Sequence, residues 1–171
     1  MKGSLLQRMD LWVRHLLPFG LTLLLVLLQA MPTRLPGFAA VAPMLPLIGV
    51  YYWSIHRPDL LPAPVAFVLA LVNDIIAGTP LGVTPLVYLM VIGMTTTQRR
   101  FFLGKPFLVA WWGFALVASA SMAVEWALVS MIFGHMLEPH AVLFELIMTV
   151  SFYPLLSWFF ARVQLALLRP A

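Results

Sequence analysis

The stretch FLVAWWGFALVASASMAVEWALVSMIF, residues 107–133, decides the class of fold. It contains a single charged side chain, Glu125. About 20 mostly apolar residues suffice for a helix to cross the hydrocarbon core of a membrane. The stretch therefore predicts a transmembrane helix, and it is long enough to tilt or to protrude from the bilayer.

Five further apolar segments surround this stretch, separated by prolines, glycines and charged residues that are typical of turns. The six predicted spans cover about 16–31, 38–55, 60–77, 83–97, 107–133 and 141–163. Residues 28–31 lack the small-x-small pattern of a signal-peptide cleavage site, which favours an uncleaved first helix. Residues 1–171 are therefore expected to form one transmembrane domain, an all-α integral membrane protein built as a six-helix bundle.

The composition excludes several other classes of protein. Apolar residues make up 63% and charged residues 9% of the 171 residues, whereas soluble domains have about 45–50% and about 25%. A soluble globular domain and a disordered chain are both excluded. The absence of cysteine excludes disulfides, thiol nucleophiles and cysteine-bound metals. The net charge of +4 is interpreted as topology signals and lipid headgroup contacts rather than nucleic-acid binding.

The distribution of basic residues predicts the orientation. With the N-terminus in the cytoplasm, nine of the ten basic residues fall on the cytoplasmic side, and only Arg34 falls outside. This asymmetry favours six spans with both ends of the chain inside. The basic loops on the cytoplasmic side then carry Arg57, Arg99, Arg100 and Lys105.

Three acidic residues lie inside or beside the predicted spans: Asp74, Glu125 and Glu145. A charged side chain facing lipid costs about 2.5–3.5 kcal/mol on insertion scales. All three are expected in the outer leaflet, so we hypothesise that they converge on a polar pocket that opens to the outside. Three interpretations stay open: hydrogen-bonded structural residues at helix ends or interfaces, a pocket for a ligand or partner, and a path for protons or cations.

The strongest local signal is LVNDIIAGTPLG, residues 71–82. Gly78 can adopt the left-handed conformation that ends a helix, and Asn73 and Asp74 can bond backbone groups that the break exposes. Pro80 and Gly82 lead into the next helix. A capped helical hairpin explains most of these residue types. A carboxylate beside a broken helix also builds ion sites in transporters, an alternative that calls for a second break.

Motifs for enzymatic chemistry are missing from the sequence. There is no glycine-rich phosphate loop and no HExxH, and the serines in the spans have no paired His and Asp. His135, Glu138 and His140 share one short loop, where exposed turn residues are expected rather than a metal site. The sequence therefore predicts no catalytic residue, no cofactor and no metal, and the protein is expected not to be an enzyme.

Three aromatic residues, Tyr51, Tyr52 and Trp53, close the second predicted span. Aromatic side chains at the end of a membrane helix favour the level of the lipid headgroups. They are therefore expected at a membrane interface.

The stretch from Pro43 to Gly82 resembles the MreD family of rod shape-determining proteins. The matching residues are Pro46-Leu47, Tyr51-Tyr52-Trp53, Arg57-Pro58, Ala66-Phe67, Leu71, Asn73-Asp74-Ile75 and Gly78-Thr79-Pro80-Leu81-Gly82, followed by Thr84 and Pro85. Size, six spans and a basic loop after the fourth span also fit, whereas the flanking spans match in hydropathy only. Asp74 is the one acid that lies on the family motif.

The resemblance implies a scaffold subunit of the bacterial cell-elongation complex in the inner membrane. Such a subunit serves rod shape and lateral peptidoglycan synthesis by binding an MreC-type single-span protein, with MreB, RodA and the RodA-associated transpeptidase as further partners. The family is similar in fold to the S-components of ECF transporters. An S-component-like subunit that binds or transports a small molecule is therefore the alternative function.

Overall fold

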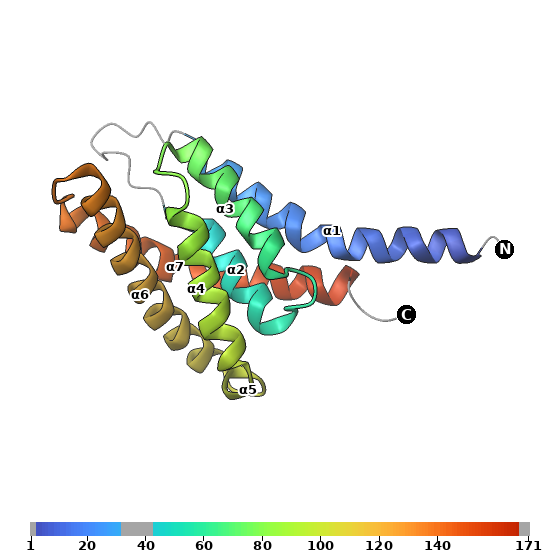
Figure 1. Cartoon of the computed structure of the whole chain (residues 1–171). Coiled ribbons are helices and arrows are strands. Elements are labelled where there is room, and N and C mark those ends of the chain that lie inside the picture. Colours follow the sequence, from blue (N-terminus) through green and yellow to red (C-terminus); the bar gives the residue numbers. More distant parts are fainter. Residues whose placement is uncertain (1–2, 32–42, 168–171) are drawn as a thin grey trace.

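The computed structural model describes residues 3–31 and 43–167, and every regular element in these residues is an α-helix. The expected all-helical fold is confirmed. The helices are α1 (Gly3–Ala30), α2 (Leu45–His56), α3 (Ala63–Ala77), α4 (Val83–Thr97), α5 (Arg99–Phe102), α6 (Phe107–Phe133) and α7 (Pro139–Leu167) (Figure 1).

Prolines stand at the start of several of these helices, and glycines end two of them. Proline stands at the first or second position of α2 and of α3, where the missing N–H leaves no helical hydrogen bond unmade. Gly78 after α3 and Gly134 after α6 both have φ 72°, the left-handed conformation that closes a helix. Because these signals are local, α4 and α6 cover the ranges 83–97 and 107–133 expected from the sequence.

The first helix differs most from its expected range. It begins at Gly3 instead of residue 16, so the charged N-terminal segment is helical. No proline interrupts residues 3–17, and Asp10 pairs with Arg14 one turn later at 2.9 Å, which supports a helix. The other differences are smaller: α5 is a short helix in the expected basic loop, and residues 38–42 of the second predicted span lie outside the described residues.

Helix lengths divide the bundle into two groups. Three helices are long and apolar enough to cross a membrane: Leu5–Ala30 of α1, α6 and α7. The apolar helices α3 and α4 have 15 residues each, which is about 22 Å at 1.5 Å per residue and short of a hydrocarbon core of about 30 Å. The structure thus supports three spans by length alone.

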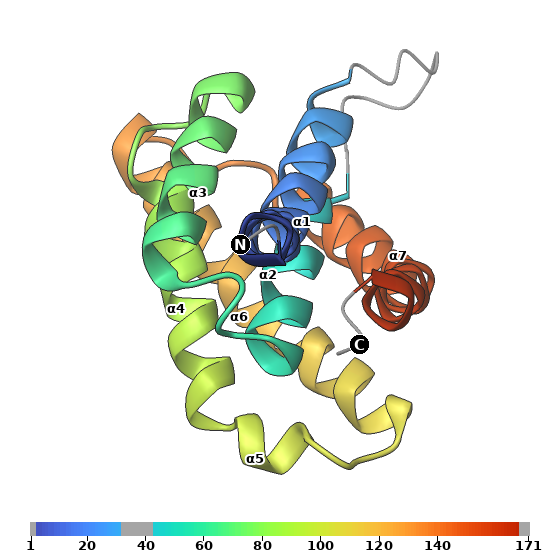
Figure 2. The same ribbon diagram turned by 90° about the vertical axis from the view of Figure 1, so that its right-hand side faces the viewer.

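Helix α2 forms the centre of the bundle. It packs against α1, α4 and α7, and the ten residues from Pro46 to Ile55 are all buried. Figure 2 shows α2 between α3 and α4 on one side and α7 on the other. A helix that is apolar on all sides is expected in such a position.

The aromatic residues of α2 correct one expectation from the sequence. Tyr51, Tyr52 and Trp53 are buried in the core instead of facing a membrane interface. The Tyr51 ring meets the rings of Phe114 on α6 and Tyr153 on α7, with centroids 5.1 and 5.7 Å apart. The Tyr51 hydroxyl donates a hydrogen bond to the Ala110 carbonyl at 3.0 Å. These large rings join α2 to α6 and α7, and the Tyr51 phenol also finds an acceptor inside the bundle.

Candidate functional site

Asp74 holds together the turn between α3 and α4. Its carboxylate accepts a hydrogen bond from the Thr79 hydroxyl at 2.6 Å and from the Gly82 N–H at 3.1 Å. Gly82 precedes α4 with φ 102°, a left-handed conformation that glycine adopts without strain. The negative charge therefore lies at the positive end of the α4 dipole. Asp74 is buried together with its neighbour Asn73, so this part of the predicted motif closes a helical hairpin.

The other two predicted acids line one cavity. This cavity has a volume of about 160 Å³ and lies between α6, α7 and the α3–α4 turn. Glu125 comes from α6 and Glu145 from α7, and both side chains are partly buried. The carboxylate oxygen Oε2 of Glu125 is fully buried and has no hydrogen-bond partner within residues 3–31 and 43–167. The remaining lining residues are Thr79, Met122, Trp126, Val129, Leu137 and Val142.

Thr79 connects the cavity to Asp74, because it lines the cavity and donates its hydroxyl hydrogen to the Asp74 carboxylate. The turn between α6 and α7 closes over the same region. The Trp126 indole N–H donates to the Leu137 carbonyl at 3.1 Å, and the Leu137 N–H donates to the Ser130 hydroxyl at 3.4 Å. The structure thus brings Glu125 and Glu145 into one cavity and places Asp74 beside it as a helix cap.

Tyr88 is a member of this group that the sequence reasoning missed. It lies on α4, its side chain is fully buried, and its hydroxyl has no hydrogen-bond partner in the described part of the chain. It interacts electrostatically with Glu125 and with Asp74. A signal was present in the sequence, because Tyr88 is the only polar side chain between Leu86 and Met94.

The predicted basic residues have different environments. Arg57 pairs with Asp59 at 3.2 Å across the α2–α3 turn, and its hydrogen bonds lower the pKa of the Asp59 carboxyl. Arg99 donates from Nε to the Ile55 carbonyl at 2.8 Å, so it caps the end of α2. Arg100 is exposed, as is Lys105, whose ammonium lies 5.7 Å from the centre of the Phe101 ring. Arg100 and Lys105 are thus the two of the four that present their charge most openly at this surface.

The site offers groups that can bind a ligand. The described residues contain no group of three or more histidine, cysteine, aspartate or glutamate side chains that could hold a metal ion. The cavity offers carboxylate oxygens and a threonine hydroxyl. Carboxylates accept hydrogen bonds, so the arrangement is suited to a group that donates them.

A comparison with known protein families gives one assignment. The sequence profile of the family described as rod shape-determining protein MreD matches residues 9–163, nearly the whole chain. Neither the comparison with curated proteins nor the comparison with solved structures finds a match.

Proposed function

We propose a scaffold function for this chain, which belongs to the MreD family of rod shape-determining proteins. In this proposal it is a multi-pass subunit of the cell-elongation complex in the bacterial inner membrane. It serves rod shape and lateral peptidoglycan synthesis by holding other proteins together: an MreC-type single-span protein, MreB, RodA and the transpeptidase that works with RodA. Membership of the family supports a structural role in cell shape.

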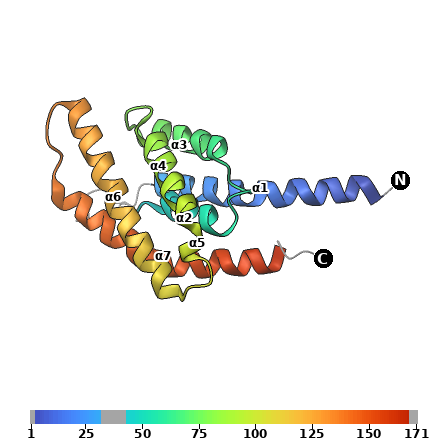
Figure 3. The ribbon, with the colours of Figure 1, turned by 60° about the horizontal axis from the view of Figure 1, so that its bottom comes forward.

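The observation that carries the proposal is the projecting half of α1. Figures 1 and 3 show the N-terminal half of α1 extending beyond every other helix of the bundle. Its second half is the part buried in the bundle, with Thr22, Leu25 and Val26 buried. Towards the first half, Trp12 and Leu16 line one side of a groove of about 460 Å³ whose other side is the start of α3. The projecting half exposes a set of large apolar side chains: Leu5, Leu6, Met9, Trp12, Val13 and Leu16.

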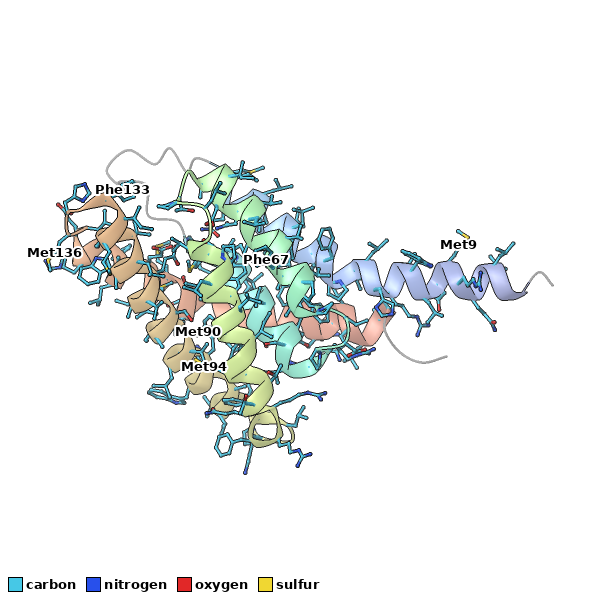
Figure 4. The ribbon with its side chains drawn as sticks, in the orientation of Figure 1. Met9, Phe67, Met90, Met94, Phe133 and Met136 are labelled. Carbon is cyan, nitrogen blue, oxygen red and sulfur yellow. The ribbon has the colours of Figure 1, made fainter. Side chains whose placement is uncertain are left out.

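The spacing of these side chains fits a helical partner. One stripe along α1 is formed by side chains at intervals of four, three and four residues, namely Leu5, Met9, Trp12 and Leu16. Figure 4 shows Met9 on this projecting part, far from the bundle. A single membrane helix can pack along such a stripe by inserting its side chains between successive turns. We propose that the MreC-type partner occupies this stripe.

The proposal includes six membrane crossings with both ends in the cytoplasm. α1 begins and α7 ends on one side of the bundle, and the α6–α7 turn lies on the other (Figure 1). In this proposal the turns that carry Arg57 and Arg100 face the cytoplasm together with the two ends, as the positive-inside rule requires. The short helices α2, α3 and α4 can still complete crossings, because backbone buried in protein need not span the lipid by itself.

Cross-linking tests the proposal directly. The chain has no cysteine, so a single introduced cysteine is the only thiol. We expect a thiol-reactive photo-cross-linker attached to Trp12→Cys to capture a co-expressed MreC-type protein in membranes. The matched control is Trp112→Cys on α6, because Trp12 and Trp112 are 69% and 70% exposed. Equal cross-linking at both positions, or at position 112 alone, would contradict docking on the α1 stripe.

The cavity between α6 and α7 favours the second candidate function, an S-component-like subunit for a small molecule. A bound ligand could donate the hydrogen bond that the buried Glu125 oxygen does not receive from the described residues. Purification in mild detergent separates the two functions. An MreC-type protein in the purified complex supports the scaffold, whereas an ATPase module of the ECF type would replace it.

A further inference from the structure

We propose that the cavity holding Glu125 and Glu145 binds a primary ammonium group, supplied by the ethanolamine headgroup of a membrane phospholipid. The inference rests on the membrane placement given under the proposed function. It goes beyond that function because it assigns a ligand to a part of the molecule that the α1 stripe does not use.

The charged side chains at the cavity are all acidic. Glu125 and Glu145 line it, and Asp74 is joined to it through Thr79. None of the lining residues is basic, and neither glutamate forms an ion pair with another residue that the structure describes. Buried carboxylates without a counter-charge are costly at membrane depth. A cation that enters the cavity removes this cost.

Two buried polar atoms, one in the cavity wall and one on α4, have no hydrogen-bond partner among the residues that the structure describes. The first is Oε2 of Glu125, which is fully buried and belongs to a side chain that lines the cavity. The second is the Tyr88 hydroxyl, which is also fully buried and interacts with Glu125 and Asp74. Buried polar groups almost always have hydrogen-bond partners, so each unpaired one calls for a ligand or water.

The donor set indicates an ammonium group rather than a metal ion. Both oxygens of the Asp74 carboxylate already accept hydrogen bonds, from Thr79 and Gly82, which leaves two carboxylates for a ligand. A primary ammonium has three N–H donors, and its hydrogen bonds to carboxylates are among the stronger ones in proteins. The volume of about 160 Å³ exceeds the share of about 30 Å³ that one water occupies, so an aminoethyl group fits.

An adjoining groove indicates that a lipid supplies the ammonium group. This groove of about 240 Å³ lies between α6 and α7 and shares Met122, Trp126 and Val142 with the cavity. Its other lining residues are Ser119, Ala123, Pro139, Leu143 and Leu146. Leu143 and Ala123 are exposed on the outside of the bundle, where a lipid chain would lie. An apolar groove that leads into an acidic cavity matches an amphiphile with a cationic head.

Lipid binding to the purified full-length chain tests the inference. The protein in detergent is incubated with three phospholipids of equal chain length, and retained lipid is measured by native mass spectrometry. The headgroups are ethanolamine, choline and glycerol. We expect at least tenfold stronger retention of the ethanolamine lipid than of the choline lipid, because a trimethylated nitrogen has no N–H to donate. Retention of all three lipids to the same degree would overturn the proposal.

A pair of charge-matched variants locates the site. Glu125→Gln keeps the shape of the side chain and removes its charge, and it should abolish the preference for ethanolamine. Glu138→Gln makes the same change at an exposed residue of the α6–α7 turn and should keep the preference. Tyr88→Phe should weaken the preference several-fold by removing one buried hydroxyl. An unchanged preference in Glu125→Gln would overturn the assignment to this cavity.

Two further measurements separate the sources of the ligand and the two proposals. Free ethanolamine should not displace the ethanolamine lipid at millimolar concentration, and displacement would reassign the cavity to a soluble amine and overturn the lipid source. Glu125→Gln should leave cross-linking from position 12 unchanged. The lipid site and the scaffold proposal can therefore fail independently of each other. A thermal unfolding curve of Glu125→Gln checks that the variant is folded.

Discussion

The indole Nε1 of Trp111 on α6 lies 3.0 Å from the backbone carbonyl oxygen of Val150 on α7. In an uninterrupted helix this carbonyl would accept the N–H of residue 154, but that residue is proline and has no N–H. Trp111 therefore supplies the hydrogen bond that Pro154 removes. Two positions 43 residues apart in sequence thus depend on each other.

Trp111→Phe is expected to destabilise the bundle by about 1 kcal/mol, because the Val150 carbonyl then has no donor. Pro154→Ala restores an N–H to that carbonyl, so the same Trp111→Phe change should cost less in the Pro154→Ala background. Thermal unfolding of the four proteins in detergent measures the coupling. Additive effects of the two substitutions would show that the indole and the proline are independent.

Asp74→Asn should destabilise the protein by about 1–3 kcal/mol, since Thr79 and Gly82 both donate to the carboxylate and an amide provides only one acceptor oxygen. Asp59→Asn is the control, because Asp59 is exposed and its ion pair with Arg57 contributes at most about 1 kcal/mol. The midpoint of urea unfolding, followed by tryptophan fluorescence, gives both values. The cap assignment fails if the two variants unfold at the same midpoint.

Gly113→Ala is expected to destabilise the bundle by about 1–3 kcal/mol. A Cβ at position 113 would overlap the Phe102 ring, which packs between α5 and α6. Gly93→Ala is the matched control, because it lies in α4 with open space around it and should stabilise the helix by about 0.5–1 kcal/mol. Phe102→Ala should rescue Gly113→Ala. Opposite signs for the two glycine substitutions are the expected result.

Single cysteines test the proposed orientation. Met136 lies at the end of the α6–α7 turn and is 85% exposed (Figure 4), whereas Arg100 belongs to α5 and is exposed between α4 and α6. A membrane-impermeant maleimide should label Met136→Cys in intact spheroplasts and Arg100→Cys only after permeabilisation. Labelling of both positions from the same side would contradict six spans with both ends in the cytoplasm.

The candidate site could be predicted from the sequence only in part. Asp74, Glu125 and Glu145 stand out because carboxylates are rare in apolar stretches, and their shared depth pointed to one region. Which acids share a cavity depended on lateral packing, and Asp74 proved to be a helix cap beside it. Tyr88 stands out as the one polar side chain in its apolar run, but the run does not tell which side of the helix faces the acids.

The sequence by itself determined the membrane class and most helix ends, because hydropathy, proline and glycine act through the local chain. Only the tertiary structure decided that α2 lies at the centre and that Tyr51, Tyr52 and Trp53 are core residues. It also decided that Trp111 meets Val150 and that Glu125 and Glu145 line one cavity. The physical reason is that lipid and a neighbouring helix present equally apolar surfaces, so hydropathy does not distinguish them. Packing shape and hydrogen-bond pairing between helices do.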